Sequence, residues 1–404
     1  LKEAKKACRF MQNVKPEVKN KALKNISEAL IQKSELIIQE NQKDIAAAKN
    51  NGIKESMVDR LLLNKERIEA MAKDILKVID LQDPIGTLVR EIKRPNGLVI
   101  QQIRIPLGVI GVIYESRPNV TVDIASLCIK TNNVCVLKGG KEAIHSNRIL
   151  VQIINEAIQD VLPAHTVTLI ETKKREETLD LIQAHDYVDV IIPRGSAGLI
   201  QYVVKNATVP VIETGAGICH LYVDQEASLD MALEIAKNAK IQRPSVCNAI
   251  ETILVHQKVA PEFLPKLKEI FKNVQIYGDE KTRKIIDCLK ATKKNYATEY
   301  DDYICNIKVV DDIEEAIEHI YNYSTKHSES IITENKETAK YFMESLDSAC
   351  VYHNASTRFS DGGEFGFGAE VGISTQKLHA RGPLGLQEIT STKYMIYGNG
   401  QVRS

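Results

Sequence analysis

One cysteine of this 404-residue chain stands in a setting that could make it a nucleophile. Cys247 lies in the segment QRPSVCNAIE, shortly after Arg243 and just before a run with strand character. A thiol attacks as its thiolate, which a nearby positive charge or an adjacent base favours. Pro244 and Ser245 favour a turn, so we expect Cys247 on an irregular segment that can enter a cleft. Cys219, in the loop GAGICH, is an alternative nucleophile.

A carboxylate precedes this cysteine in the chain. Glu213 ends the apolar run VPVIE and opens the glycine loop TGAGICH. The carboxyl ends of parallel strands border the ligand crevice of a doubly wound sheet. We therefore expect Glu213 to face the ligand crevice. The competing interpretation is a strand-end carboxylate that caps a loop.

Composition and charge exclude several classes of function. Lys plus Arg and Asp plus Glu number 53 each, which argues against nucleic acid as the main partner. None of the eight cysteines has C-x-x-C spacing or a zinc pattern, so no metal is predicted. Most of the cysteines fit buried positions in a reducing compartment. The charged N-terminal segment and the lack of a long apolar run predict a cytoplasmic protein.

The chain divides into stretches of different character. Residues 22–50 and 56–80 have helical periodicity, the first ending at Asn50-Asn51-Gly52. Pro95-Asn96-Gly97 predicts a hairpin over 90–105, and 389–400 is expected to form a final strand. Both look like sheet edges that a second subunit would cover, so we expect a homo-oligomer, a dimer or tetramer.

Strands and helices alternate through the rest of the chain. Apolar strands are predicted over 108–114, 134–138, 166–170, 188–193 and 209–213, with helices near 121–131, 143–160, 175–184 and 196–205. A second series has helices at 228–240, 261–272 and 279–290, strands at 251–256 and 274–278, and a strand–helix–strand unit over 304–333. This order predicts an α/β protein with a parallel, Rossmann-like sheet and a second α/β domain.

These motifs resemble, in the same order, those of the aldehyde dehydrogenase superfamily. Glu213 and Cys247 match its Glu-x-Gly-Gly loop and the catalytic cysteine that follows it. In hydrolytic relatives this glutamate activates water, whereas the resemblance here implies that Glu213 tunes the thiol or lines the nicotinamide site. PLGVIGVIY is similar to its first core strand. The resemblance covers nearly the whole chain and implies an aldehyde dehydrogenase-like fold: a Rossmann-like cofactor domain, a catalytic α/β domain and a β-hairpin oligomerisation arm.

Four longer segments resemble one branch of that superfamily, the γ-glutamyl phosphate reductases: IYESRPNVTVD, ETGAGICHLYVD, NAKIQRPSVCNAIETILVH and ARGPLGLQEITSTKY. The resemblance implies NADPH-dependent reduction of L-glutamyl 5-phosphate to L-glutamate 5-semialdehyde, with release of phosphate. This reaction is the second step of proline biosynthesis from glutamate. It would proceed through a thioacyl intermediate on Cys247, and a separate glutamate 5-kinase would supply the acyl phosphate.

The resemblance also assigns cofactor-binding residues. Lys138, in VCVLKGGKEA, is similar to the lysine that meets the adenosine ribose, and Gly195-Ser196 to the turn near the pyrophosphate. Glu299 is similar to the glutamate that holds the nicotinamide ribose. Lys141 stands where NAD-preferring relatives carry a glutamate. A lysine attracts a 2′-phosphate that a glutamate repels, so NADP(H) is expected.

The implied substrate carries a phosphate and an α-carboxylate, which call for cationic partners. Arg243, Arg117 and Arg381 are the expected anion-binding residues, with Arg358 as a further candidate and His220 as an additional donor. A solvated arginine is the competing interpretation for each of them.

The tetrahedral intermediate needs hydrogen-bond donors for its oxyanion. The backbone N–H of Cys247 is one candidate. Hydrolytic relatives add an asparagine from the loop after the first core strand. Here that loop reads YESRPNV, which leaves Asn119 and Arg117 as alternatives for the second donor.

The same reasoning gives domain boundaries. We expect an NADP-binding domain at 1–90 and 105–213, a catalytic domain at 214–375, and an oligomerisation arm at 91–104 and 385–404. Three other functions remain open: a different enzyme of the superfamily, a thiol hydrolase that pairs Cys247 with His220, and a non-catalytic nucleotide-binding protein.

Overall fold

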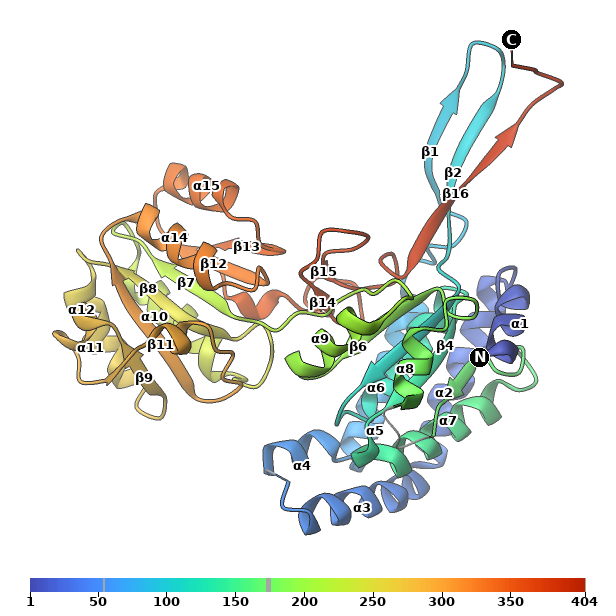
Figure 1. Ribbon diagram of the computed structural model, residues 1–404, viewed down its shortest axis with the longest axis horizontal. Helices are drawn as coiled ribbons and strands as arrows, with labels where there is room; N and C mark the ends of the chain where they lie inside the picture. Colours follow the sequence, from blue (N-terminus) through green and yellow to red (C-terminus); the bar gives the residue numbers. More distant parts are fainter. Residues whose placement is uncertain (54, 172–175, 404) are drawn as a thin grey trace. The chain divides into compact units, whose positions relative to one another are not determined.

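The computed structural model describes residues 1–53, 55–171 and 176–403, and it divides into two compact units (Figure 1). The first comprises Leu1–Thr214, Gly366–Gly372 and Leu384–Ser404, and the second Gly215–Phe365 and Ile373–Pro383. Each unit is described separately below.

A four-stranded parallel sheet forms the centre of the first unit. Its order is β5 (Val167–Leu169), β4 (Val134–Gly139), β3 (Val109–Tyr114) and β6 (Val190–Arg194). Every residue of β3 and β4 is buried, as expected for strands covered on both faces. The chain runs from β3 to β4 and β5 on one side and returns to β6 on the other. This change of direction places the topological switch point between β3 and β6.

The helices that follow these strands agree with the predicted α/β alternation: α6 (Asn119–Lys130), η1 (Lys141–Ala143), α7 (Ile144–Ile158), α8 (Glu176–Ile182) and α9 (Ala197–Asn206). Residue 175, the first of the helix predicted near 175–184, lies outside the described residues. The fifth predicted strand is wrong. Residues 209–213 contribute only an isolated bridge between Val211 and Ile191, because Pro210 cannot donate a ladder hydrogen bond.

The N-terminal helices are more divided than the periodicity predicts. The unit begins with α1 (Lys2–Met11), and the region expected as one helix up to residue 50 consists of α2 (Pro16–Gln32) and α3 (Ser34–Asn50). Likewise, 56–80 consists of α4 (Glu55–Leu61) and α5 (Lys65–Asp80). The second break arises because Asn64 caps a new helix, its side chain accepting a hydrogen bond from Arg67 N.

An antiparallel sheet of three strands extends from the first unit and is called the arm here. It consists of β1 (Leu88–Lys93), β2 (Val99–Pro106) and β16 (Thr390–Tyr397) (Figure 1). The predicted hairpin is confirmed, with Gly97 at φ +89° in its turn. The predicted final strand is also confirmed. It pairs with β2 along its whole length, and so one edge of the hairpin is covered by the chain itself.

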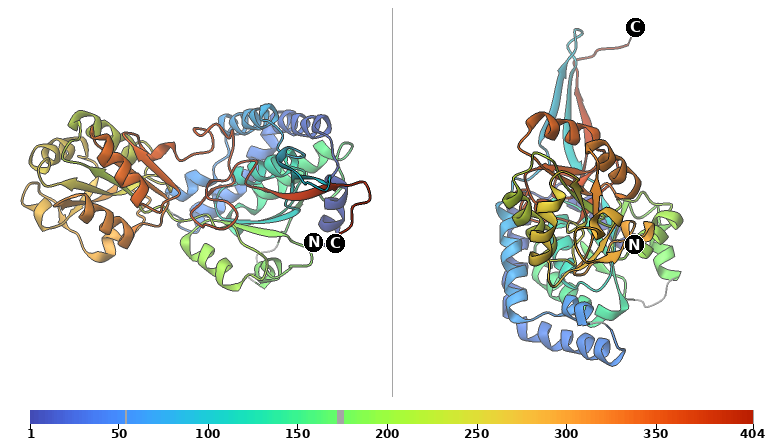
Figure 2. Two further views of the ribbon diagram at one scale, coloured as in Figure 1. Left: turned by 90° about the horizontal axis from the view of Figure 1, so that it is seen from above. Right: turned by 90° about the vertical axis from the view of Figure 1, so that its left-hand side faces the viewer.

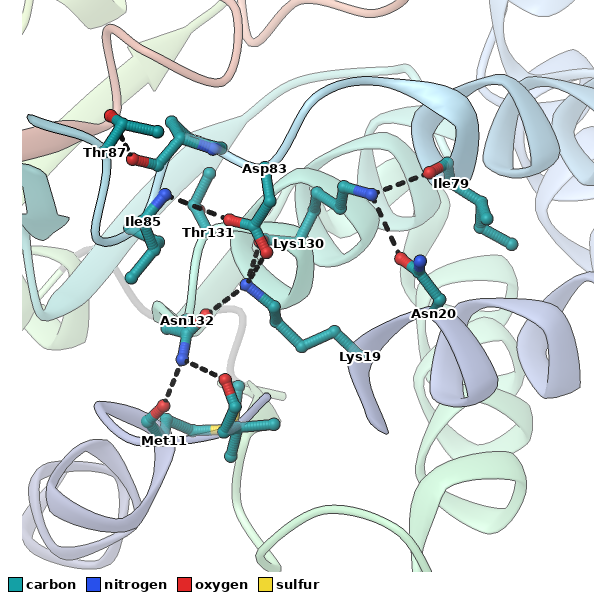
Figure 3. Close-up of polar contacts among 12 residues, drawn as sticks. Met11, Lys19, Asn20, Ile79, Asp83, Ile85, Thr87, Lys130, Thr131 and Asn132 are labelled. Atoms are coloured by element: carbon teal, nitrogen blue, oxygen red, sulfur yellow. Dashed lines mark hydrogen bonds and ion pairs between the residues drawn. The ribbon is translucent and has the colours of Figure 1, made fainter. Parts of the chain in front are cut away.

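A buried polar cluster holds the segment that leads into the arm (Figure 3). Lys19 Nζ lies 2.5 Å from Asp83 Oδ2 and 2.8 Å from the carbonyl oxygen of Lys130, to which it donates. Asp83 Oδ1 in turn accepts from Ile85 N at 3.0 Å. Only 1% of the Lys19 side chain is exposed. The chain between α5 and β1 is therefore tied to α2 and to the C-terminal end of α6.

The second unit contains a seven-stranded sheet in which all described pairings are parallel. Its order is β10 (Leu289–Lys290), β9 (Gln275–Gly278), β11 (Ile304–Val310), β8 (Ile250–His256), β7 (Cys219–Val223), β12 (Ser328–Ile332) and β13 (Cys350–His353). The predicted strand–helix–strand unit over 304–333 is confirmed as β11, α14 (Ile313–Tyr323) and β12.

Helices cover both faces of this sheet (Figure 2). Leu221 and Val223 pack with residues of α10 (Leu229–Ile241) and α11 (Ala260–Ile270), whereas Tyr222 packs with α14 and α15 (Lys336–Ser345). This division follows from the alternation of side chains along a strand. The remaining elements are α12 (Glu280–Arg283), α13 (Lys293–Tyr296), η2 (Thr357–Phe359), β14 (Ile373–Ser374) and β15 (Gly382–Pro383).

The helix predicted over 279–290 is wrong beyond its first turn. Asp279 caps α12 by accepting from Thr282 N, but the helix ends at Arg283, and Leu289–Lys290 pair with β9 as strand β10. Among the described residues, no helix combines the length and apolar character required to span a lipid bilayer.

Candidate active site

The segment between α10 and β8 carries Cys247 and is called the nucleophile loop here, residues 242–249. Ala249 N donates to Val246 O at 3.0 Å, which forms a tight turn around the cysteine. None of the eight cysteines forms a disulfide; six are buried, and Cys247 and Cys288 are partly exposed. The prediction that most of the cysteines are buried is confirmed, Cys128 and Cys135 among them. Cys219, the alternative nucleophile, is fully buried, and its burial raises its pKa well above the ordinary value.

The glycine loop after Glu213 presses directly on the nucleophile loop. A Cβ atom on Gly217 would lie only 1.5 Å from the carbonyl oxygen of Cys247. The Cys219 thiol donates a hydrogen bond to the same oxygen at 3.2 Å. Only glycine permits this approach of one backbone to another. The Gly217 contact therefore fixes the position of the Cys247 peptide group.

The residue after the cysteine is anchored by a third segment. Asn248 Nδ2 donates to the carbonyl oxygens of Ser360, at 2.9 Å, and Arg358, at 3.2 Å. Thr357 Oγ1 donates to the Asn248 carbonyl oxygen at 2.6 Å, and the Arg358 guanidinium contacts the Asn248 side-chain oxygen. The amide of Asn248 thus joins η2 to the nucleophile loop.

Two arginines give the neighbourhood of Cys247 a positive character. Arg243 is exposed within the nucleophile loop, and Arg358 is partly buried with its Nε 3.1 Å from Gln242 Oε1. Burial lowers the pKa of Arg358; Arg243 lowers it further, while Asp361 and Cys247 raise it. A guanidinium stays protonated at neutral pH despite such a shift. Both positive charges therefore favour a thiolate on Cys247.

A buried ion pair connects the residues on either side of the nucleophile loop. Lys240, in the last turn of α10, lies 2.9 Å from Glu251 in β8, and their side chains are 0% and 1% exposed. Burial raises the pKa of Glu251, and the nearby Lys240 ammonium opposes this shift. The pair therefore joins α10 to β8, the two elements that the nucleophile loop connects.

Glu299 lies beside the same glycine loop. Its Oε1 accepts a hydrogen bond from Gly217 N at 2.7 Å. The structure therefore brings together Cys247, Arg243, Arg358 and Glu299 around the loops of the second unit.

The structure places two other predicted anion-binding residues differently. The His220 side chain is fully buried in β7, where its Nδ1 lies 3.1 Å from Glu329 Oε2. The expectation that His220 contacts substrate, or serves as base to Cys247, is therefore wrong. Arg381 contacts Asp347 at 2.9 Å and also donates to the Asp347 carbonyl oxygen at 2.8 Å. This ion pair lowers the pKa of Asp347. The Arg381 guanidinium is therefore already engaged by Asp347.

The predicted cofactor residues of the first unit gather at the carboxyl ends of β3, β4 and β6. Ser196 caps α9 by accepting from Leu199 N at 3.4 Å, and its own N–H donates to Glu115 Oε2 at 2.8 Å. The N-terminus of α9 thus already holds a carboxylate, which shows that this edge accepts negative charge. Gly195 has Glu115 so close that a Cβ would lie 2.5 Å from its Oε2.

Two lysines flank the same edge. Lys138 is buried at the end of β4, and its burial lowers its pKa, against the effects of Glu177 and Glu142. Lys141 is exposed at the start of η1. A cationic rim and a capped helix N-terminus at a switch point fit a nucleotide that carries a pyrophosphate and a further phosphate.

The candidates for the second oxyanion donor also lie in the first unit. Asn119 begins α6, and its Nδ2 donates to Asp123 Oδ2 at 2.9 Å, so this amide is already engaged. Arg117 is partly exposed in the preceding loop. Glu213 is also partly exposed, and the next residue, Thr214, donates to Pro193 O at 2.6 Å.

Sequence reasoning missed Asn248 and Glu115, and it did not single out Gly217. Asn248 lies between the nucleophile and the apolar strand β8. A polar residue at this position is a signal that could have identified it. Among the described residues, no group of three or more His, Cys, Asp or Glu side chains is placed to hold a metal ion.

Comparisons with known proteins agree with this geometry. The sequence profile of the Aldehyde dehydrogenase family matches residues 1–289. The γ-glutamyl phosphate reductase of Petrotoga mobilis is 55% identical over 405 residues, which span all of this chain and 97% of that protein. The crystal structure of γ-glutamyl phosphate reductase from Thermotoga maritima matches with TM-score 0.97 and 48% identity, covering all of this chain and 98% of that one.

A more distant structure shows the fold alone. An engineered glycolyl-CoA reductase with bound NADP⁺ matches with TM-score 0.71 at 15% identity, covering 98% of this chain and 95% of that one. The predicted aldehyde dehydrogenase-like α/β fold is thereby confirmed. The chain belongs to the aldehyde dehydrogenase family and, within it, to the γ-glutamyl phosphate reductases.

Proposed function

We propose that this protein reduces L-glutamyl 5-phosphate to L-glutamate 5-semialdehyde with NADPH and releases phosphate. The observation that carries this proposal is the nucleophile loop. Cys247 is the partly exposed cysteine beside Arg243 and Arg358, and its peptide group is fixed by Gly217 and Asn248. The substrate is inferred from the names of the relatives, and the reaction type is inferred from the nucleophile loop.

The proposed reaction begins at the thiol. The Cys247 thiolate attacks the carbonyl carbon of the acyl phosphate, a C–S bond forms, and the C–O bond to phosphate breaks. Phosphate leaves with the electron pair of that bond. When bound, NADPH supplies the hydride that reduces the resulting thioester to a thiohemiacetal. The sulfur then leaves as thiolate, and the aldehyde is released.

The oxyanion that forms at each tetrahedral step needs donors already in place. The peptide N–H of Cys247 is the first, because Gly217 fixes the orientation of the adjoining loop. Asn119 and Arg117 are the alternatives for the second. For Asn119 to serve, its amide must exchange the hydrogen bond to Asp123 for one to the substrate. Glu213 serves this reaction by tuning the thiol or lining the nicotinamide site, since activating a water molecule would divert the thioester.

The substrate anions require cations that are accessible. Arg243 is exposed beside the nucleophile, and Arg358 carries its guanidinium over the same loop. These two, with Arg117, are the proposed partners of the phosphate and the α-carboxylate. Bidentate pairing with arginine suits both groups.

The first unit is the proposed NADP(H)-binding domain, the second the catalytic domain. Lys138 and Lys141 would flank the adenosine ribose and its 2′-phosphate, Gly195 and Ser196 the pyrophosphate, and Glu299 the nicotinamide ribose. The positive charge of Lys141 favours NADP(H) over NAD(H). The glycolyl-CoA reductase of the same fold carries NADP⁺, which supports this assignment.

The substitution Cys247→Ala tests the proposal. It should reduce NADPH oxidation at least 1000-fold, an order of magnitude typical for loss of a covalent nucleophile, while NADPH binding and thermal stability persist. Cys288→Ala, at the other partly exposed cysteine, is the matched control and should retain activity. A Cys247→Ala enzyme that keeps a sizeable fraction of the wild-type rate would show that another residue is the nucleophile.

A further inference from the structure

A cavity in the second unit lies apart from the nucleophile loop. Its volume is about 660 Å³, and residues of α12, α13, β11 and α14 line it together with the short β10 segment. None of its lining residues belongs to residues 242–249 or to the glycine loop. Cavities of this volume are typical of sites for drug-sized organic molecules and are much larger than a single inorganic anion needs.

The charges around this cavity do not cancel once their partners are considered. Asp279 caps α12, Glu280 pairs with Lys284 at 3.5 Å, and Glu315 pairs with Lys308 at 2.8 Å. Glu280 and Glu315 are therefore already paired with cations, whereas Asp279 is engaged only in hydrogen bonds.

Three cations at the rim have no such partner. Within the described part of the chain, Arg283, Lys290 and Lys293 line the cavity, are exposed and form no ion pair. Asp279, which caps α12, and Glu318 are the acidic lining side chains without an ion pair among the described residues, so three unpaired cations face two unpaired carboxylates. The rim therefore has an excess of positive charge and favours an anion.

The floor of the cavity has a different character. Tyr296, His319 and Tyr323 pack ring against ring, with centroids 4.8 Å apart for Tyr296–His319 and 4.7 Å apart for His319–Tyr323. Burial lowers the pKa of His319 to about 2, so the imidazole is neutral at pH 7 and the floor is uncharged. Aromatic rings of this kind offer both flat surface and polar edges.

Two polar atoms of this floor are buried without hydrogen-bond partners: the Tyr296 hydroxyl and His319 Nε2. Their residues are 8% and 4% exposed. A buried polar group without a partner costs about 1–3 kcal/mol. Most buried polar groups are satisfied, so two unsatisfied ones in the wall of one cavity need an explanation. A ligand whose hydrogen-bonding edge presses against the rings provides one.

We propose that this cavity binds a nucleoside phosphate, with the flat base against Tyr296 and His319 and the phosphate at Arg283, Lys290 and Lys293. This chemical class combines a planar, uncharged, hydrogen-bonding end with an anionic end. The site is separate from the cofactor site of the first unit and adds a second nucleotide to the protein.

The test uses adenosine 5′-monophosphate as the probe. Calorimetric titration of the full-length protein, with the cofactor site already saturated by NADP⁺, should reveal one further AMP site per chain. The double substitution Arg283→Gln/Lys290→Gln should weaken AMP binding at least tenfold. Lys237→Gln/Lys272→Gln, two exposed lysines elsewhere on the same unit, is the matched control and should leave the affinity unchanged.

A single-atom change separates the base from the phosphate. Tyr296→Phe keeps the ring and removes the unpartnered hydroxyl, so it should weaken AMP several-fold while leaving the unliganded protein as stable or more stable. No AMP binding in the presence of NADP⁺ would overturn the proposal. So would inorganic phosphate binding as tightly as AMP, or a Tyr296→Phe protein with unchanged AMP affinity.

Discussion

At the scale of single residues, the chemistry depends on how closely the backbone approaches Cys247. The thiol needs positive charge nearby, which Arg243 and Arg358 supply, but it also needs a fixed peptide group behind it. Gly217 provides this by packing its Cα against the Cys247 carbonyl oxygen. The Glu299 contact to Gly217 N adds a side chain of the proposed cofactor site to the same arrangement.

The substitution Gly217→Ala tests this packing. The added methyl would meet backbone atoms 1.5–2.8 Å away, which cannot move as a flexible side chain can. We expect kcat to fall at least 100-fold, because a displacement of about 1 Å at a reacting group has this effect. The control is Gly198→Ala in helix α9, whose added methyl would lie 4.0 Å from its nearest neighbour, Ser196 Oγ, and which should leave activity intact. Wild-type activity in Gly217→Ala would show that the loop tolerates displacement.

At the scale of elements, the nucleophile loop is held by the helix and the strand that flank it. Lys240 and Glu251 join α10 to β8 through a fully buried ion pair. Breaking such a pair by removing one partner leaves a buried charge and is strongly destabilising, whereas replacing both partners with apolar residues is often neutral.

We therefore expect Lys240→Met to destabilise the protein by about 3 kcal/mol and to slow alkylation of Cys247 by iodoacetamide. The double substitution Lys240→Met/Glu251→Leu should recover most of the stability but not the alkylation rate. Two apolar side chains can fill the space, but they do not replace the ion pair that positions the loop. Lys19→Met breaks the buried Lys19–Asp83 contact of the first unit and is the matched control. It should lower the melting temperature without changing alkylation; equal slowing in both variants would contradict the positioning role.

The element scale also shows what the sequence could and could not predict. The Pro95-Asn96-Gly97 turn and the apolar strands other than 209–213 were predicted correctly because their signals are local. The breaks at Lys33 and Asn64 were missed because helical periodicity continues across them: Leu30 and Ile37 are both fully buried. The short β10 was taken for helix, since only its pairing with β9 defines it.

Within the site, the nucleophile was found from its neighbours in the sequence, whereas its supports were not. Asn248 acts through carbonyl groups of residues 358 and 360, more than a hundred positions away. His220 looked like a donor beside the glycine loop, but the side-chain alternation of β7 turns it into the core against Glu329. Contacts of this kind depend on tertiary packing, which motif spacing does not report.

At the scale of the whole molecule, the arm has exposed apolar side chains that a single chain does not cover. Its strands expose large apolar side chains: Leu88, Val89, Tyr394, Ile396 and Tyr397. A sheet of three strands that buries so little is not expected to persist alone. We propose that the arms of a homo-oligomer cover these residues.

Replacing Tyr394 and Ile396 together by lysine should lower the mass measured by light scattering at micromolar concentration to that of the monomer, 45.1 kDa. Both positions are about 60% exposed in the chain, so the substitutions should not disturb its own fold. Tyr187→Lys, at an exposed tyrosine outside the arm, is the control. A monomeric wild-type protein would show that the arm has another purpose.

We propose that the thioester on Cys247 is exchanged with phosphate and not hydrolysed. Arg243 and Arg358 favour an anion near the thioester, where proximity raises its effective concentration. The direct measurement is NADP⁺ reduction with L-glutamate 5-semialdehyde, with and without inorganic phosphate. We predict sustained turnover only with phosphate, or with arsenate in its place, and at most one NADPH per active site without either. Sustained NADPH formation without phosphate or arsenate would mean that water accepts the acyl group, with Glu213 as its general base.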